Sequence, residues 1–117
     1  MKSKNEIKQT YKETKFRSGV YQIRNINNKK IFIDSSTDLD AIWNRHKFQL
    51  NNNLHPNINL QREWTKFGQQ NFDYEILSEI KTDDAKTINY RKEAKELAIL
   101  FIEERQPFDD KGYNKRV

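Results

Sequence analysis

Apolar and polar residues alternate along three parts of the chain, and each alternation predicts a β-strand. The first covers residues 19–26 and the second covers residues 31–33. Between them lies the polar stretch Asn27-Asn28-Lys29-Lys30. Because asparagine tolerates a left-handed backbone, this stretch predicts a hairpin turn. Residues 72–80 alternate in the same way and predict a third strand.

Two helices are predicted between the second and third strands. Apolar residues recur every three or four positions from Leu39 onward, which is the helical period. The preceding residues 34–38 carry side-chain oxygens that suit a loop and a helix N-cap. His55-Pro56-Asn57 breaks this helix and caps a second one, which ends at Gly68.

A third, long helix is expected to be capped by Asp83 or Asp84 and to end at Pro107. Its residues 97–102 are apolar on every side, so this segment is expected to lie between other elements or to be half-covered by a partner. The order strand, strand, helix, helix, strand, helix predicts an α/β protein of the α+β type. Its core would be a small three-stranded antiparallel sheet flanked by helices.

Composition narrows the class of protein. The 117 residues correspond to one domain, and the 12% of aromatic residues supply a core even though 33% of the chain is charged. The absence of cysteine and the presence of only two histidines exclude disulfides and a thiolate zinc site. The longest apolar run, residues 97–102, is far too short to span a membrane, and no apolar signal segment follows Met1. We therefore expect a cytoplasmic protein without a membrane partner.

The net charge of +5 is concentrated near the N-terminus. Residues 1–17 hold six basic and two acidic side chains, which is four of the five net charges. We expect a basic N-terminal arm over 1–17 and a single domain over 18–117. Such an arm can contact phosphates without reading a base sequence, although a solvated lead-in helix has the same composition.

A second, weaker basic region lies between residues 41 and 72, where Glu63 is the only acidic side chain. The following residues 73–84 are mainly acidic, so a polarised surface is expected. The expected partner is nucleic acid, with DNA preferred over RNA. The side chains predicted to bind it are Arg45, Lys47, His55, Arg62 and Lys66.

An ordered series of short motifs resembles the GIY-YIG nuclease family. Gly19-Val20-Tyr21 is similar to the GIY tripeptide, and Ile31-Phe32-Ile33-Asp34 occupies the place of the YIG segment. Further matches follow in the family's order up to Gly112-Tyr113-Asn114, so the resemblance runs from about Ser18 to Asn114. They are His46, His55-Pro56-Asn57, Leu60-Gln61, Phe67-Gly68, Phe72 and Glu75-Ile76-Leu77. The resemblance implies a GIY-YIG-like fold.

The resemblance also implies roles for individual side chains. In the family, phosphodiester hydrolysis depends on the two motif tyrosines, on a helix glutamate that binds one divalent ion, and on a helix arginine. Tyr21 matches the first tyrosine, and His46 and Asn114 match family positions. Arg45 is the nearest counterpart to the arginine, so the candidate catalytic residues are Tyr21, Arg45, His46 and Asn114. Judged without the resemblance, Tyr21 and His46 also suit packed core side chains.

Four positions depart from the family pattern, and each would remove a different catalytic contribution. Phe32 lacks the hydroxyl of the second tyrosine, and Asp34 replaces the glycine of YIG with a carboxylate. Ile42 stands where the family has its arginine, and Ala98 stands where it has the metal-binding glutamate. No metal ligand is identified, and no cofactor is certain. Mg²⁺ or Mn²⁺ would be required if catalysis is retained.

Three functions are consistent with this sequence. The first is a nucleic-acid-binding, GIY-YIG endonuclease-like domain whose catalytic site is degenerate. The second is an active, divalent-metal-dependent DNA endonuclease in which Arg45 supplies the cation and Asp34 or Glu75 binds the metal. The third is a non-enzymatic module on the same scaffold that forms a homodimer or holds a protein partner through residues 97–102.

Overall fold

The computed structural model describes residues 16–82 and 87–116, and its strands and helices occur in the predicted order. The strands are β1 (Gly19–Asn25), β2 (Ile31–Ser36) and β3 (Phe72–Glu79). The helices are α2 (Ile42–Asn51), α3 (Ile58–Phe67) and α4 (Tyr90–Arg105), with short 3₁₀ turns at Gln69–Asn71 and Asp109–Lys111. Apart from Phe16 and Arg17, the predicted basic arm lies outside the described residues.

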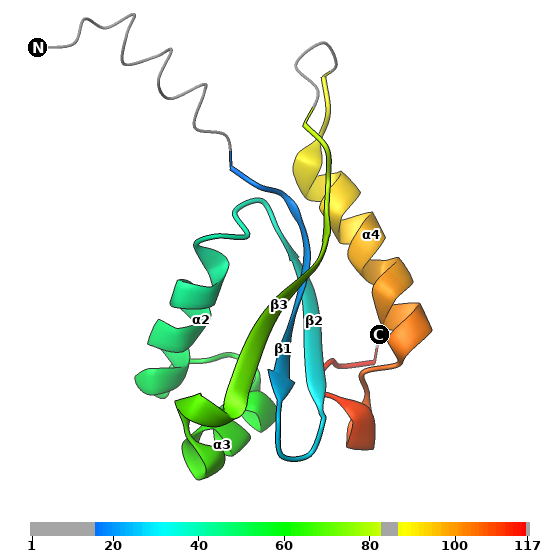
Figure 1. Cartoon of the computed structure of the whole chain (residues 1–117). Coiled ribbons are helices and arrows are strands. Elements are labelled where there is room, and N and C mark those ends of the chain that lie inside the picture. Colours follow the sequence, from blue (N-terminus) through cyan, green and yellow to red (C-terminus); the bar gives the residue numbers. More distant parts are fainter. Residues whose placement is uncertain (1–15, 83–86, 117) are drawn as a thin grey trace, which may run out of the picture.

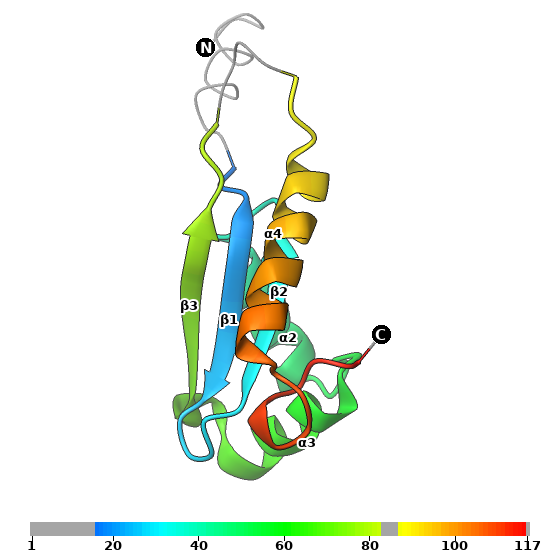
Figure 2. The ribbon, with the colours of Figure 1, turned by 90° about the vertical axis from the view of Figure 1, so that its right-hand side faces the viewer.

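The three strands form one antiparallel sheet in the order β2-β1-β3, so β1 is central. Helix α4 covers one face of this sheet, and α2 and α3 cover the other (Figure 1). The same layers are seen from the side in Figure 2. The predicted α+β architecture, with a small antiparallel sheet flanked by helices, is confirmed.

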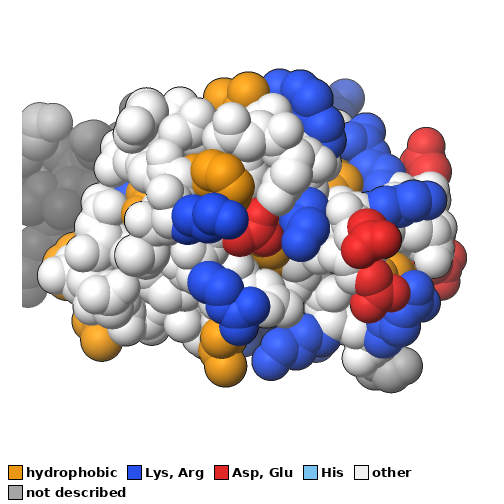
Figure 3. Space-filling view, turned by 90° about the horizontal axis from the view of Figure 1, so that it is seen from below, with side chains coloured by type: hydrophobic (Ala, Val, Ile, Leu, Met, Phe, Trp, Pro, Cys, Tyr) orange, Lys and Arg blue, Asp and Glu red, His pale blue; other side chains and the backbone are white. Residues whose placement is uncertain are grey.

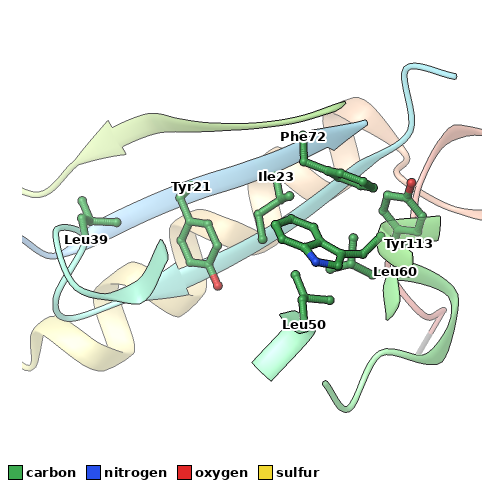
Figure 4. Packing of buried hydrophobic residues seen from close by; sticks show 8 residues of the cluster. Tyr21, Ile23, Leu39, Leu50, Leu60, Phe72 and Tyr113 are labelled. Atoms are coloured by element: carbon green, nitrogen blue, oxygen red, sulfur yellow. The ribbon is translucent and has the colours of Figure 1, made fainter. Parts of the chain in front are cut away.

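Alternation along the strands divides the core into two clusters. Tyr21 and Ile23 of β1 face α2 and α3, where they pack with Leu50, Leu60 and other buried side chains (Figure 4). The intervening positions face α4 and form the second cluster, in which Val20, Ile33 and Ala98 are buried. The period of two along β1 therefore decides which helices each side chain meets.

The predicted hairpin is present, but its left-handed residue is Lys29, with φ of 67°, and not an asparagine. The asparagines act through their side chains. The Asn25 side chain accepts a hydrogen bond from the backbone N–H of Asn27 at 2.9 Å, and the Asn28 side chain accepts one from the N–H of Lys30 at 3.0 Å. Asparagine therefore closes this turn by imitating a backbone carbonyl rather than by adopting a left-handed conformation.

The helix starts were predicted with mixed success. Asn57 caps α3 as expected, because its side chain accepts a hydrogen bond from the N–H of Leu60 at 3.0 Å. Helix α2 begins at Ile42 and not at Leu39, since the intervening residues form a turn. The proposed cap of α4 at Asp83 or Asp84 was wrong. Those residues lie outside the described part of the chain, and Asn89 caps a helix that begins at Tyr90.

The apolar segment 97–102 of α4 is covered on one side only. Ala98 is buried against the sheet, whereas Ile99 and Leu100 are 48% and 60% exposed. The expectation that this segment lies between other elements of the fold was wrong, because α4 forms an outer layer. Within residues 16–82 and 87–116, no helix combines the length and apolar character that crossing a bilayer requires.

Gly19, the first residue of the GIY-like tripeptide, is required by the close approach of β3. A Cβ atom at this position would lie 2.0 Å from the carbonyl oxygen of Ser78. The register between β1 and β3 shifts at the next step, between Val20 and Tyr21. Glycine at this position therefore allows β1 and β3 to approach closely just before Tyr21, whose side chain faces α2 and α3.

Replacing Leu60 by alanine tests the packing of α3 on the sheet. Leu60 is fully buried, so Leu60→Ala is expected to lower the free energy of unfolding by about 2–5 kcal/mol. Leu54→Ala is the matched control, because Leu54 is 64% exposed and its loss should cost less than about 0.5 kcal/mol. Urea unfolding of both variants measures the difference. Equal midpoints for the two variants would contradict the proposed core.

Candidate active site

A cavity of about 580 Å³ opens at the free edge of β2, between α2 and the C-terminal segment. Most of the site residues singled out in the sequence line it. They are Tyr21, Phe32, Asp34, Ile42, Arg45, His46, His55 and Asn114. Lys47, Arg62, Lys66 and Ala98 do not line it, and Ala98 packs in the core cluster beneath α4. Residues that are far apart in sequence thus meet at one place, and this cavity is the candidate site.

A chain of hydrogen bonds links the three polar rings at the base of the cavity. The hydroxyl oxygen of Tyr21 lies 2.6 Å from Nε2 of His46. Nδ1 of His46 lies 2.8 Å from Nε2 of His55. The backbone N–H of Asn57 donates to Nδ1 of His55 at 3.0 Å. All four residues are largely buried, and each of them also lines the cavity.

The end of this chain at Asn57 sets the direction of every bond in it. A backbone N–H can only donate, so Nδ1 of His55 carries no proton and its Nε2 does. The His55 Nε2–H therefore donates to Nδ1 of His46, whose proton must then sit on Nε2. That Nε2–H donates to the Tyr21 oxygen, which leaves the hydroxyl hydrogen of Tyr21 free to donate elsewhere.

Burial keeps these groups neutral at physiological pH. Loss of hydration lowers the pKa of His46 to about 4, with smaller contributions from the charges of His55 and Arg45. Burial also lowers the pKa of His55. For Tyr21, burial raises the pKa well above its usual range, so its hydroxyl stays protonated. The neutral forms are the ones that the directed hydrogen bonds require.

Two charged side chains that line the cavity, Asp34 and Arg45, shift the pKa of Tyr21 in opposite directions. Asp34 is its direct cross-strand partner on β2, so the two side chains share one face of the sheet. After burial, the Asp34 carboxylate is the next cause of the raised Tyr21 pKa, and the Arg45 guanidinium acts in the lowering direction. A carboxylate and a guanidinium therefore both lie near enough to Tyr21 for their charges to act on its hydroxyl. Burial raises the pKa of Asp34, while the N–H of Ser35 and the charge of Lys95 on α4 act in the lowering direction.

The side chain of Asn114 forms hydrogen bonds with the backbone of β2 at the edge of the sheet. Its side-chain amide donates to the carbonyl of Ile33 and accepts from the Ile33 N–H, both at 2.8 Å. The neighbouring Tyr113 N–H donates to the carbonyl of Ile31 at 2.9 Å. The C-terminal segment thus satisfies backbone groups that an edge strand would otherwise leave open. Asn114 lines the cavity, but its amide is engaged in holding this wall in place.

Three of the four residues that depart from the family pattern, Phe32, Ile42 and Ala98, pack against neighbouring side chains. The Phe32 ring packs edge-on against His46 and His55, with centroids 5.9 and 6.4 Å apart. Ile42 packs against the core cluster beneath α2 and α3. Ala98, at the position that the resemblance assigns to the metal-binding glutamate, is 3% exposed and packs with Val20 and Ile33.

The metal ligand that the resemblance implies is missing, because Ala98 stands at the position of the family's glutamate and is buried in the core. Within the described ranges, no three His, Cys, Asp or Glu side chains lie close enough together to hold an ion. Asp34 is the one carboxylate among the residues that line this cavity. Because the Lys95 charge already acts on that carboxylate, a divalent cation there would face an adjacent positive charge.

The fold brings only two of the five side chains predicted to bind nucleic acid to the cavity. Arg45 and His55 line the cavity, but Lys47, Arg62 and Lys66 do not. Lys47 lies over the Trp43 ring at 5.4 Å, and Lys66 lies over the Phe67 ring at 5.3 Å. The end of the molecule that contains the hairpin and α3 carries basic and acidic side chains side by side (Figure 3). The predicted polarised surface is not seen at this end.

Sequence reasoning missed three cations near the cavity. Lys115 lines it directly, and Arg91 and Lys95 line an adjoining cavity beside Arg45. Arg91 and Lys95 are four residues apart on α4, and this spacing puts them on one helix face. The spacing was visible in the sequence, but nothing local indicated that this face would lie opposite α2.

Known proteins provide a comparison for this site and fold. No protein-family model matches the chain. The solved structure of the catalytic domain of homing endonuclease I-TevI is 32% identical, with a TM-score of 0.70 over 86% of this chain and 99% of that domain. A mutant of the same catalytic domain is 33% identical, with a TM-score of 0.70 over 85% of this chain and 93% of that one.

One curated relative also matches. Intron-associated endonuclease 1 of Enterobacteria phage T4 is 41% identical over 64 residues, which is 55% of this chain. The match covers 26% of that relative, so the chain spans about a quarter of its length. The catalytic-domain structures are matched over nearly their whole length, with the same fold and more than 30% identity. Together with the ordered GIY-like and YIG-like strands that meet at one cavity, this places the chain in the GIY-YIG nuclease family.

Proposed function

We propose that this chain is a nucleic-acid-binding GIY-YIG domain whose catalytic site is degenerate. The observation that carries the proposal is the burial of Ala98 at the position of the family's metal-binding glutamate. A methyl group packed against Val20 and Ile33 provides no ligand for an ion that would neutralise charge on a phosphodiester.

The other departures act in the same direction. Phosphodiester hydrolysis needs a positioned nucleophile and stabilisation of the negative charge that develops on the phosphate. Phe32 removes a hydroxyl, Ile42 removes a guanidinium, and Asp34 adds a negative charge. Groups that act as one catalytic unit are non-additive, so the loss of any one of them can remove most of the activity of the unit.

Binding of nucleic acid is supported separately from catalysis. The relatives found by comparison are endonucleases, which act on nucleic acids. The cavity here keeps Arg45 and Lys115 at its rim against a single carboxylate, and the whole chain carries a net charge of +5. Cations beside a cavity provide sequence-independent affinity for phosphates.

Tyr21 suits binding better than proton abstraction. Its hydroxyl oxygen accepts from His46, so its hydrogen remains available for an acceptor such as a phosphate oxygen. The raised pKa keeps that hydrogen in place. The histidine chain thus orients a neutral donor toward the cavity.

A second candidate function is an active endonuclease with relocated groups. The observation that favours it is the joint action of Arg45 and Asp34 on Tyr21, because a guanidinium and a carboxylate at this hydroxyl could replace the lost arginine and metal ligand. Glu75, the other carboxylate considered for this role, instead accepts a hydrogen bond from Gln22 at 2.9 Å.

A plasmid-nicking assay separates the two functions. We expect no conversion of supercoiled plasmid by the full chain with either Mg²⁺ or Mn²⁺, since no protein carboxylate is placed to hold the ion as in the family. Tyr21→Phe and Arg45→Gln serve as matched variants and should behave like the wild type. Metal-dependent nicking that disappears in both variants would overturn the degenerate site and establish the relocated one.

Salt dependence tests the proposed binding. With Arg45 and Lys115 each contacting a phosphate, the affinity for a fluorescent 20-base-pair duplex should fall by at least about tenfold between 50 and 200 mM KCl. Arg45→Gln should weaken binding and reduce the slope of log affinity against log salt by about one. Fluorescence anisotropy measures both quantities. Affinity that does not change with salt would contradict the proposal.

The buried histidine pair makes the fold sensitive to mild acid. The pKa of His46 is lowered from 6.5 to about 4, so the unfolded chain binds more protons than the folded one between these values. Stability from this group is complete above about pH 6.5 and is lost as the pH falls toward 4, by up to about 3 kcal/mol. His55 is shifted in the same direction.

Urea unfolding from pH 7.5 to pH 4.5 checks this expectation. The double variant His46→Gln/His55→Gln is the reference, because it keeps every carboxylate and removes only the imidazoles. The wild type should be the more stable protein at pH 7.5, and its advantage should shrink steadily below pH 6.5. A difference that stays constant over this range would show that the pair is not held neutral.

A further inference from the structure

A second cavity of about 390 Å³ adjoins the candidate active site. It lies between the end of β2, the loop that leads to α2, and the first half of α4. The two cavities share Asp34, Ser35, Ile42 and Arg45 in their walls, so Arg45 stands at their junction. A ligand longer than a single group can therefore extend from one cavity into the other.

Three cations from two different helices converge on this second cavity. Arg45 comes from α2, and Arg91 and Lys95 come from one face of α4. Asp34 is the one acidic residue in the lining, so the cavity is positive on balance. Lys95 is placed to offset that acid, because its charge acts on the Asp34 carboxylate.

Among the residues that the structure describes, none of these three cations forms an ion pair, and Asp34 is the one acidic side chain that lines the cavity with them. Arg17, Arg24 and Arg116 each form an ion pair with an aspartate or a glutamate. Single exposed cations are common on protein surfaces, but three that meet at one cavity repel one another unless an anion joins them.

Small hydroxyl side chains complete the cavity wall opposite α4. Ser35, Ser36 and Thr37 line it. The Ser36 oxygen accepts a hydrogen bond from the N–H of Asp38 at 2.9 Å, so its hydrogen remains free to donate. Guanidinium and hydroxyl donors around one space match the several acceptor oxygens of a phosphate group.

We propose that this second cavity binds a backbone phosphate of the same nucleic-acid strand that occupies the candidate active site. The inference rests on the proposed nucleic-acid binding and adds where the strand runs, from the Tyr21 cavity past Arg45 to Arg91 and Lys95. The cations that bind the phosphate backbone of the strand are therefore those of α4 beside the active site, and not those of α3.

Fluorescence anisotropy with the 20-base-pair duplex, and with one of its strands alone, tests this path. The double variant Arg91→Gln/Lys95→Gln should weaken duplex binding about tenfold at 100 mM KCl and reduce the salt slope by about two. The exchange Arg91→Lys/Lys95→Arg keeps both charges and should stay within about threefold of the wild type. Both side chains are exposed, so the variants should fold, which circular dichroism verifies.

The matched control is Lys92→Gln/Lys111→Gln, which removes two exposed charges that line neither cavity and should change affinity by less than about twofold. Equal effects of the control and of Arg91→Gln/Lys95→Gln would overturn the site while leaving nucleic-acid binding intact. A larger loss in Arg62→Gln/Lys66→Gln than in the α4 variant would also overturn it and place the strand on α3.

Titration with inorganic phosphate separates the two possible sources of the anion. Amide resonances of residues 35–37 and of Arg91 and Lys95 should respond more strongly to the oligonucleotide than to phosphate at equal phosphate concentration. A wild-type chain that binds neither strand form at 50 mM KCl would defeat the proposed function and this site together. Response to inorganic phosphate without oligonucleotide binding would overturn the nucleic-acid ligand and retain only an anion site.

Discussion

The hydrogen-bond chain from the Asn57 backbone to the Tyr21 hydroxyl is the constraint on which the candidate site depends. It joins the start of α3, the middle of α2 and the central strand, so the two helices cannot move independently of the sheet. Since the backbone N–H at its end can only donate, each proton along the chain has one position. The site is therefore preorganised around a neutral tyrosine whose donor points away from the histidines.

Around this hydrogen-bond chain, side chains that support the fold lie beside positions to which the family resemblance assigns catalytic groups. Asn114 still closes the edge of β2, and Gly19 still allows Tyr21 to enter the site. The positions of the arginine and the glutamate, by contrast, are apolar and packed against the two core clusters. Packing and hydrogen bonding that support the fold are thus separable from the groups that would stabilise charge on a phosphate.

The distribution of cations follows the layers of the fold rather than the order of the sequence. Helices α2 and α4 lie on opposite faces of the sheet (Figures 1 and 2), and residues of both helices line the second cavity beside the edge strand β2. Cations at that edge can therefore face each other across the cavities. Several other arginines are neutralised in ion pairs, including Arg24 with Asp73 across β1 and β3. Arg45, Arg91 and Lys95 form no ion pair among the described residues, and all three line the second cavity.

The sequence alone determined the order of the elements, the capping role of Asn57 and the end of α3 at Gly68, because caps and periods are local. It misplaced the left-handed residue of the hairpin and the cap of α4, where several polar residues could serve equally well. Only the tertiary structure decided that His55 joins His46 and that Arg91 and Lys95 lie beside Arg45. These contacts depend on how two helical layers pack on one sheet, and no short-range sequence pattern shows which distant residues will be close in space.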